Sequence, residues 1–283
     1  MSIVTFWNAM DKENAQTFSA IALATYMAME HNFKILLIDT TFNDITTERA
    51  FWKKKKENKA FTELTGGKMD ISNGVEGLFS AVASNKATPE IVINYTKIVF
   101  KNRLDVLLGP RTKKRKEYNN SFPLYDDLIL TASKYYDLVL VDLAKGRKNE
   151  TIASILGHSN LILYTMPPNL ANIDNYIELK KNKDPIVSSM KTLPFLTRSD
   201  ESSSYNVKNT TRYINEKEQI MTLPYNVRFM EAVNESNIAK FMTNTKLSKS
   251  ALQVNGDFFE ELQKTSNKIL DKLKELSKMQ NVV

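Results

Sequence analysis

The 283-residue sequence contains no cysteine, only two histidines and no stretch of about 20 consecutive apolar residues. Without cysteine there is no disulfide framework and no thiolate metal site, and His31 and His158 alone cannot build an imidazole zinc site. The first residues, MSIVTFWNAM, lack the basic and apolar regions of a signal peptide. We therefore expect a cytoplasmic protein without a membrane span or a structural zinc ion.

Glycine is also scarce, and the first glycine of the chain is Gly66. The segment from Phe6 to Ala28, FWNAMDKENAQTFSAIALATYMA, lies between an apolar strand-like run and a helical run of small residues, where nucleotide-binding proteins carry a phosphate loop. Such a loop needs several backbone N–H groups to turn inward at close approach, which a Cβ obstructs. The segment therefore does not predict a standard glycine-rich loop.

Positive charge is concentrated in two short runs. The net charge is +7, and the runs are WKKKKENK at Trp52 to Lys59 and RTKKRKEY at Arg111 to Tyr118. Such runs suit phosphate backbones or anionic lipid, although most charge runs are solvated faces. The candidate anion patch comprises Lys53, Lys54, Lys55, Lys56, Arg111, Lys113, Lys114, Arg115 and Lys116.

Short apolar runs recur along the chain, and most are followed by a helical pattern. Continuous rather than alternating apolar character is typical of parallel strands buried on both faces. The runs are SIVTFW, KILLID, LDVLLG, YDLVLVDL, NLILYTM, KTLPFL and QIMTLP. They predict a doubly wound α/β domain with a mainly parallel sheet flanked by helices, whose central strands begin near Ser2, Lys34 and Leu138.

One domain over residues 1–250 and a C-terminal helix within residues 251–283 account for the chain. Thr17 and Asn169 are available as caps near helix starts, and the serine-rich segment from Thr197 to Asn209 is expected to be a loop. An apolar stripe marks the last helix, which either packs on the sheet or binds a membrane surface or a partner. The stripe consists of Phe258, Phe259, Leu262, Ile269, Leu270, Leu273, Leu276 and Met279.

Four segments in order resemble the ParA/MinD family of deviant Walker P-loop ATPases, of the SIMIBI class. They are IVTFWNAMDKENAQTFSAIALATYMA, KILLIDTTFND, YYDLVLVDLAKG and IMTLPYNVRFMEAVNES, and the resemblance runs from about Ile3 to Met242. It implies a P-loop NTPase-like fold. It also places Asp39 and Asp142 on the family's two acids, with Thr17 as a third Mg²⁺ ligand.

The same resemblance implies which residues would contact ATP. The phosphate-loop positions are Asp11, Lys12, Glu13, Asn14, Ala15, Gln16 and Thr17, and the loop that approaches adenine contains Pro224, Tyr225 and Asn226. The family's KGGxGKT loop departs here in its chemistry, because Gln16 replaces the phosphate-binding lysine and all three glycines are lost. Asp11 stands at or next to the position of the family's signature lysine. Because the loop has lost this chemistry, Asp39 and Asp142 are interpreted as vestigial.

These departures favour a pseudo-ATPase that needs no cofactor, with ATP and Mg²⁺ as ligands only where the cleft still functions. The first hypothesis is a non-catalytic scaffold that positions a bacterial machine such as a pilus, conjugation or secretion system, as in TadZ- or VirC-like branches, at a cell pole or through a membrane-bound partner. The alternative is a ParA-like partition ATPase that binds DNA non-specifically. A working ATPase with an unusual loop, a homodimer and peripheral membrane association through the last helix also remain open.

Overall fold

The computed structural model describes residues 1–10, 15–53, 74–84, 88–146, 149–247 and 249–280. An eight-stranded sheet forms its centre, in the order β3-β4-β2-β5-β1-β6-β7-β8. The strands are β1 Ser2–Trp7, β2 Ile35–Asp39, β3 Lys97–Phe100, β4 Leu104–Leu107, β5 Leu138–Asp142, β6 Leu161–Met166, β7 Thr192–Ser199 and β8 Met221–Pro224.

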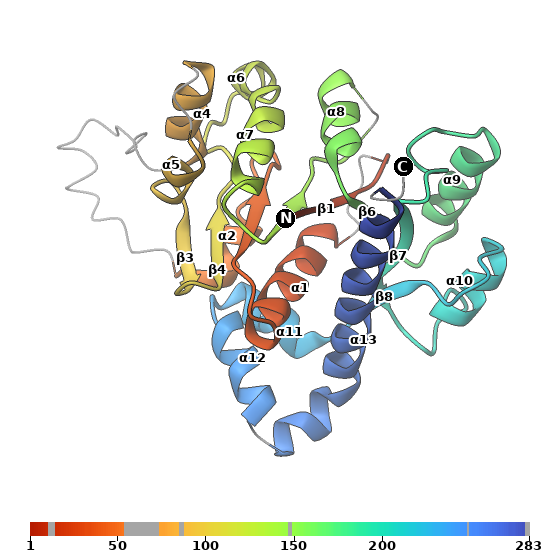
Figure 1. Cartoon of the computed structure of the whole chain (residues 1–283). Coiled ribbons are helices and arrows are strands. Elements are labelled where there is room, and N and C mark those ends of the chain that lie inside the picture. Colours follow the sequence, from red (N-terminus) through yellow and green to blue (C-terminus); the bar gives the residue numbers. More distant parts are fainter. Residues whose placement is uncertain (11–14, 54–73, 85–87, 147–148, 248, 281–283) are drawn as a thin grey trace.

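Helices cover both faces of this sheet (Figure 1). In the view of Figure 1, α4, α6, α7, α8 and α9 lie above the sheet, and α1, α11, α12 and α13 lie below it. The helices are α1 Gln16–Glu30, α2 Thr46–Phe51, α4 Val75–Ala83, α5 Pro89–Ile93, α6 Arg115–Ser121, α7 Leu124–Ser133, α8 Glu150–His158, α9 Leu170–Lys181, α10 Val207–Tyr213, α11 Val227–Asn234, α12 Ile238–Leu247 and α13 Lys249–Gln280.

The predicted parallel α/β sheet is confirmed, and the three strands expected at its centre, β2, β5 and β1, are neighbours there. All neighbouring strands are parallel except β3 and β4. The sequence reading missed β3, a four-residue edge strand whose Ile98 is exposed and which carries no long apolar run. Since an antiparallel neighbour needs only a short turn, Lys101 to Arg103 suffice to connect it to β4.

Two local expectations need correction. Thr17 is not a cap, because α1 begins at Gln16 and the preceding Ala15 makes no side-chain cap bond; Asn169 does cap α9 and accepts from Asn172 N. The segment from Thr197 to Asn209 is not all loop. Its first residues continue β7, where Thr197 is fully buried, and its last residues enter α10.

The last helix, α13, packs against the underside of the sheet. Phe258, Leu262 and Ile269 are buried in the same cluster as the small residues of α1. Thr265 Oγ1 donates to Thr222 O of β8 at 2.9 Å, and the ring of Phe259 lies 6.2 Å from that of Tyr26. Most of the apolar stripe thus faces the sheet, whereas Met279 at its end is exposed. Among the described residues, no helix is both long and apolar enough to span a bilayer.

Candidate functional site

Two buried carboxylates lie side by side at the carboxyl edge of the sheet. Asp39 is the last residue of β2 and Asp142 the last residue of β5, and the parallel register pairs them directly. Each is 1% exposed. The site predicted from the two strand-ending acids is therefore formed, because parallel strands bring their carboxyl ends to one edge.

Hydrogen bonds hold each acid in place. Asp39 Oδ1 accepts from Thr41 N at 2.8 Å and from Thr41 Oγ1 at 2.5 Å. Asp142 Oδ1 accepts from Gln16 Nε2 at 2.6 Å. The second oxygen of Asp142, Oδ2, and the hydroxyl of Thr17 are both buried without a hydrogen-bond partner among the described residues. Two unpaired oxygens therefore remain at the start of α1.

Burial raises the pKa of both acids, and their proximity adds to the effect at Asp39. Desolvation, followed by repulsion from Asp142, raises the pKa of Asp39 to about 7. Desolvation raises the pKa of Asp142 to about 6, although the hydrogen bond from the Gln16 amide and the charge of Lys145 partly offset the rise. The pair thus holds protons at pH values where exposed aspartates are ionised.

Gln16, which the sequence resemblance places at the lysine position of the family's loop, has a fully buried side chain. Its Nε2 donates to Asp142 Oδ1 at 2.6 Å and to Leu143 O at 2.7 Å, and Thr165 Oγ1 lies 3.1 Å from its Oε1. The amide therefore links α1 to β5 and β6. An uncharged amide that donates to Asp142 does not supply the positive charge that a lysine brings to a phosphate.

The start of the loop is anchored by a second amide. Asn8, directly after β1, donates through Nδ2 to Thr165 O and to Asn172 Oδ1, the latter at 3.1 Å, and its Oδ1 accepts from Met10 N at 2.6 Å. Asn169 in turn accepts from Asn172. This amide network was not predicted from the sequence, where its one signal is a polar residue immediately after a buried strand.

The loop ends at Ala15, which has a φ of 56° and is buried. This left-handed conformation costs an L-residue about 1–2 kcal/mol and is normally taken by glycine. The backbone thus keeps a glycine-like conformation at the residue before α1, although the side chain has a Cβ. Asp11, Lys12, Glu13 and Asn14 of the predicted phosphate loop lie outside the described residues.

A close approach on the other side of Asp39 favours glycine. A Cβ on Gly109, just after β4, would lie 3.0 Å from Thr41 O and 3.4 Å from Asp39 Cγ. Gly109 belongs to the strand that resembles the family's GLxVLPG segment. The backbone of this segment therefore forms one wall of the acid site.

The residues predicted to approach adenine lie apart from the acids. Pro224 ends β8, and Tyr225 and Asn226 follow it. Two strands, β6 and β7, separate β8 from β1, which is roughly 14 Å at the usual strand spacing. Tyr225 is half-exposed, and Asn226 accepts from Phe229 N as the cap of α11. These residues and Gln16 thus lie at the same edge of the sheet but at different strands.

The described members of the anion patch are all exposed, namely Lys53, Arg111, Lys113, Lys114, Arg115 and Lys116. Glu48 of α2 lies 2.8 Å from Lys97 and 3.6 Å from Arg111. Lys97 lies 5.1 Å over the ring of Trp52, so the beginnings of the two basic runs come together around β3. Lys114 pairs with Glu117, which reduces the net charge there. Lys54, Lys55 and Lys56 lie outside the described residues.

Comparison with known proteins decides the fold. The chain superposes on a ParA family ATPase from Chlorobium tepidum TLS with a TM-score of 0.66 at 15% identity, covering 93% of this chain and 98% of that one. The chain has the ParA/MinD fold. MinD from Pyrococcus horikoshii OT3, complexed with Mg-ADP, gives 0.63 at 13% identity, covering 96% of this chain and 99% of that one.

A third ParA/MinD-fold structure contains a partner protein. A chain of the MinC:MinD cell division protein complex from Aquifex aeolicus gives a TM-score of 0.60 at 12% identity, covering 96% of both chains. No protein-family model matches this sequence, and no curated protein matches it at a significant level. The likeness therefore rests on structure and covers nearly the whole chain.

The oxygen ligands at the acid site fit a magnesium ion only in part. Mg²⁺ prefers oxygen ligands, and Thr17 Oγ1 and Asp142 Oδ2 are buried and unpaired beside Asp39. No cluster of three His, Cys, Asp or Glu side chains suited to a metal exists within the described ranges. A metal here would depend on phosphate oxygens for its remaining ligands. Among the described loop residues, Gln16 replaces the lysine that would bind that phosphate.

Proposed function

We propose that this chain is a non-catalytic ParA/MinD-fold scaffold that positions a bacterial macromolecular machine such as a pilus, conjugation or secretion system. The observation that carries the proposal is the Gln16 amide, which bonds Asp142 and Leu143 O where the family's lysine would bind phosphate. Phosphoryl transfer depends almost entirely on positioning and charge stabilisation. A site with a neutral amide and two acids of raised pKa supplies little of either.

Partner binding is the function that remains when catalysis is lost. The related MinD fold occurs in a complex with MinC, so this architecture can present a surface to another protein. The chain keeps the complete sheet and both helical layers although its loop departs from the family's. We attribute that retention to a role of the surfaces, because the loop chemistry alone does not require the fold.

Calorimetry and a phosphate-release assay test this function directly. Wild-type protein titrated with ATP and Mg²⁺ is expected to give no saturable heat and no hydrolysis above the buffer rate. The matched variant is Asp142→Asn, which keeps an oxygen to accept from Gln16. Hydrolysis by the wild type that disappears in Asp142→Asn would show a working metal site and refute the non-catalytic function.

The second candidate is a partition protein that binds DNA without sequence preference. It is favoured by the shared contact of Lys97 and Arg111 with Glu48, which brings the starts of the two basic runs together. Changing Lys113, Lys114, Arg115 and Lys116 to glutamine should then weaken binding to any duplex. Each lost phosphate contact reduces the slope of log affinity against log salt by roughly 0.9.

The control changes four exposed lysines near α9 and α10, namely Lys181, Lys183, Lys208 and Lys217, to glutamine. It removes the same charge from another region and should leave binding nearly unchanged. If the wild type does not bind duplex DNA even at about 50 mM salt, where counterion release favours binding, the partition candidate is wrong.

A further inference from the structure

A large cleft of the described structure lies beside the acid pair rather than over it. It has a volume of about 1200 Å³ and is formed by the loop after β1, the loop after β5, α6, the start of α8 and the end of α9. Gln16, Thr17, Asp39 and Asp142 do not line it, and neither do the residues after β8. Among the described residues, this cleft is therefore distinct from the positions that the resemblance assigns to Mg²⁺ and adenine.

Two cations line the cleft from different elements. Arg115 lies at the start of α6, where its guanidinium is 4.9 Å from the ring centre of Phe42 and 5.4 Å from that of Tyr118. Lys145 lies on the loop after β5, and its charge lowers the pKa of Asp142. The one carboxylate of the lining, Asp184, accepts from Ile186 N and Val187 N at 3.0 Å. The described residues of the lining thus carry a net positive charge.

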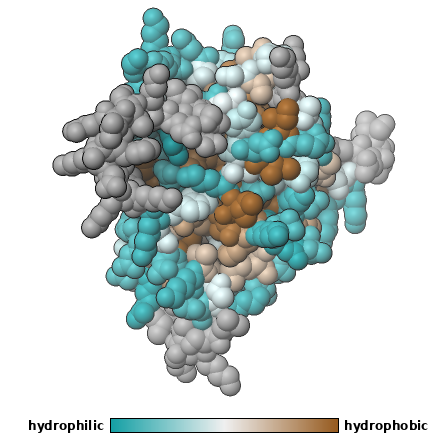
Figure 2. All heavy atoms as spheres, turned by 90° about the vertical axis from the view of Figure 1, so that its left-hand side faces the viewer, coloured by the Kyte–Doolittle hydropathy of each residue, from teal (hydrophilic) through white to brown (hydrophobic). Residues whose placement is uncertain are grey.

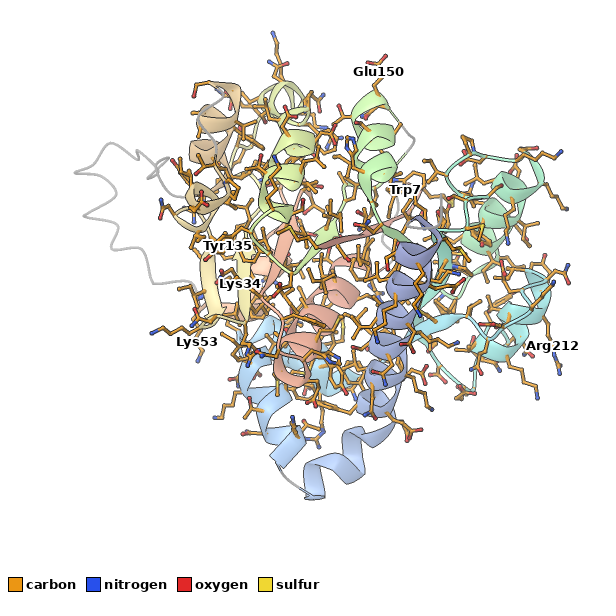
Figure 3. The ribbon with its side chains drawn as sticks, in the orientation of Figure 1. Trp7, Lys34, Lys53, Tyr135, Glu150 and Arg212 are labelled. Carbon is orange, nitrogen blue, oxygen red and sulfur yellow. The ribbon has the colours of Figure 1, made fainter. Side chains whose placement is uncertain are left out.

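Neutral donors and apolar side chains complete the cleft. Trp7 lines it, and the buried Nε1 of Trp7 has no hydrogen-bond partner in the part of the chain that the structure describes. Figure 3 shows Trp7 between α8 and α9 near the end of β1, and Glu150 pointing away from the sheet at the outer end of α8. Phe122, Ile152 and Leu179 supply apolar contact.

We infer that this cleft binds a small organic anion, whose carboxylate or phosphate group lies between Arg115 and Lys145 and whose body contacts the apolar wall. The volume exceeds what an inorganic ion fills and falls in the range of small-molecule sites. The site differs from a solvated basic face because its cations belong to a concave lining that also contains the apolar side chains of Phe122, Ile152 and Leu179. Recognition combines charge-assisted hydrogen bonds with apolar burial.

The tryptophan in the lining provides the measurement. The chain has two tryptophans, so Trp52→Phe leaves Trp7 as the only one. In EDTA, this protein is titrated with ADP as an organic phosphate, with benzene-1,3,5-tricarboxylate as an organic carboxylate, and with adenosine as an uncharged control. We expect a saturable change of Trp7 fluorescence with at least one anion and none with adenosine. The anion that binds identifies the ligand group.

Variants in the Trp52→Phe background locate the bound anion. Arg115→Gln and Lys145→Gln should each weaken binding by about tenfold, since each removes a charge-assisted bond. Lys113→Gln, an exposed neighbour outside the lining, should not change it, and melting curves confirm that each variant is folded. The inference is overturned if neither anion changes the Trp7 fluorescence in a saturable way up to about 10 mM, a concentration well above the dissociation constants of small-molecule sites. The inference is also overturned if Thr17→Val weakens anion binding whereas Arg115→Gln and Lys145→Gln do not, because that result places the ligand at the start of α1.

Discussion

The acid pair ties the stability of this chain to pH. Asp39 and Asp142 have raised pKa values in the folded state, about 7 and about 6, whereas both are near 3.9 when unfolded. Between about pH 4 and pH 7 the folded state therefore binds more protons than the unfolded state. The free energy of unfolding should be highest below this window and fall as the pH rises through it.

Replacing Asp39 with asparagine tests this coupling. The amide oxygen can still accept from Thr41, but the buried charge is gone. We expect Asp39→Asn to raise the free energy of unfolding at pH 8 by about 1–3 kcal/mol and to raise it by less at pH 5. Urea unfolding in EDTA at both pH values measures it. Asp271→Asn on the exposed side of α13 is the control, and an equal effect of Asp39→Asn at both pH values would contradict the assignment.

The residues of the site differ in how far the sequence could predict them. Asp39 and Asp142 each end a continuous apolar run, so strand topology alone brings them together. The partners of Gln16 could not be predicted, because Leu143 and Thr165 lie more than a hundred residues away in the chain. An amide at the lysine position indicates lost charge, but only the fold shows that it bonds the neighbouring acid.

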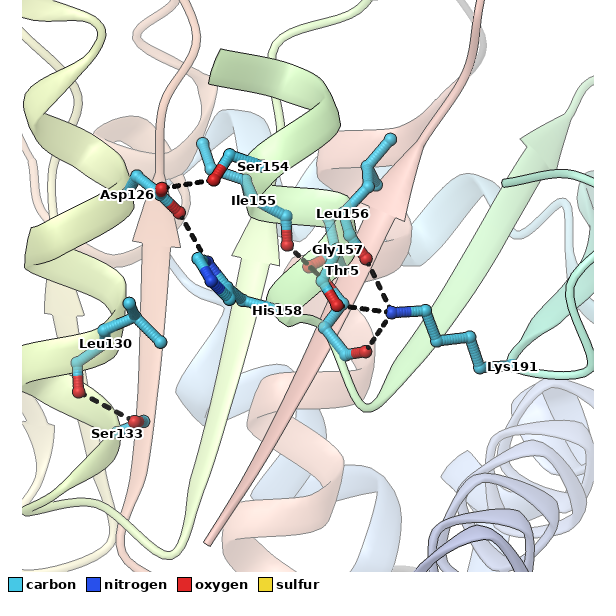
Figure 4. A network of polar contacts seen from close by, with 11 residues as sticks. Thr5, Asp126, Leu130, Ser133, Ser154, Ile155, Leu156, Gly157, His158 and Lys191 are labelled. Atoms are coloured by element: carbon cyan, nitrogen blue, oxygen red, sulfur yellow. Dashed lines mark hydrogen bonds and ion pairs between the residues drawn. The ribbon is translucent and has the colours of Figure 1, made fainter. Parts of the chain in front are cut away.

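At the scale of single elements, α8 ends in an unusual cap. Lys191 Nζ, from the segment before β7, donates to Leu156 O at 2.9 Å, Gly157 O at 2.6 Å and Ser159 O at 2.9 Å (Figure 4). The last carbonyls of a helix have no partners within it, and a cation there also interacts favourably with the helix dipole. Partial burial lowers the pKa of Lys191, so its desolvation offsets part of this gain.

Lys191→Met should destabilise the protein by about 1–3 kcal/mol, because it keeps a chain of similar length but leaves three carbonyls without their donor. The midpoint of urea unfolding measures the loss. Lys208→Met on the exposed face of α10 controls for the loss of one positive charge and should change stability by less than about 0.5 kcal/mol. Equal effects of the two variants would show that the cap contributes nothing specific.

Two substitutions in α13 test whether its apolar stripe belongs to the core. Leu262 is fully buried with side chains of α1 and β8, whereas Met279 is 45% exposed. Leu262→Ala should cost about 2–5 kcal/mol, and Met279→Ala should stay within about 0.5 kcal/mol. Chemical unfolding compares the two. A similar small effect for both would instead favour a helix that detaches to bind a membrane or a partner.

Elements with strong periodicity were the ones that could be predicted. The seven apolar runs all became strands, since buried parallel strands need apolar side chains on both faces. The edge strand β3 and the helix α6 were not predicted. The sequence of α6 follows a run of lysine and arginine, and Tyr118 is its one buried residue, so it shows no apolar periodicity. Tyr118 donates to Thr40 O at 2.8 Å, a tertiary contact that no local pattern indicates.

The whole molecule allows a prediction about assembly. In the family that the sequence resembles, two subunits close face to face over two nucleotides, with the signature lysine and the trapped phosphates in the interface. Here Asp11 stands near that lysine position, and Gln16 is bonded to Asp142 and Leu143. Nucleotide therefore has little differential affinity for a closed dimer, and a ligand without differential affinity shifts no equilibrium.

We accordingly expect the oligomeric state to be independent of ATP. Sedimentation velocity of the wild type should give the same distribution with and without ATP and Mg²⁺, whether the protein is a monomer or a constitutive dimer. Gln16→Lys, which restores the charge at the lysine position, is the informative variant, since a nucleotide-dependent dimer confined to it would show that the amide removed the switch. A clear shift from monomer to dimer in the wild type on adding nucleotide would contradict the non-catalytic scaffold. It would mean that nucleotide still binds the closed dimer more tightly than the monomer. Each hundredfold difference between these two affinities shifts the equilibrium toward the dimer by about 2.7 kcal/mol.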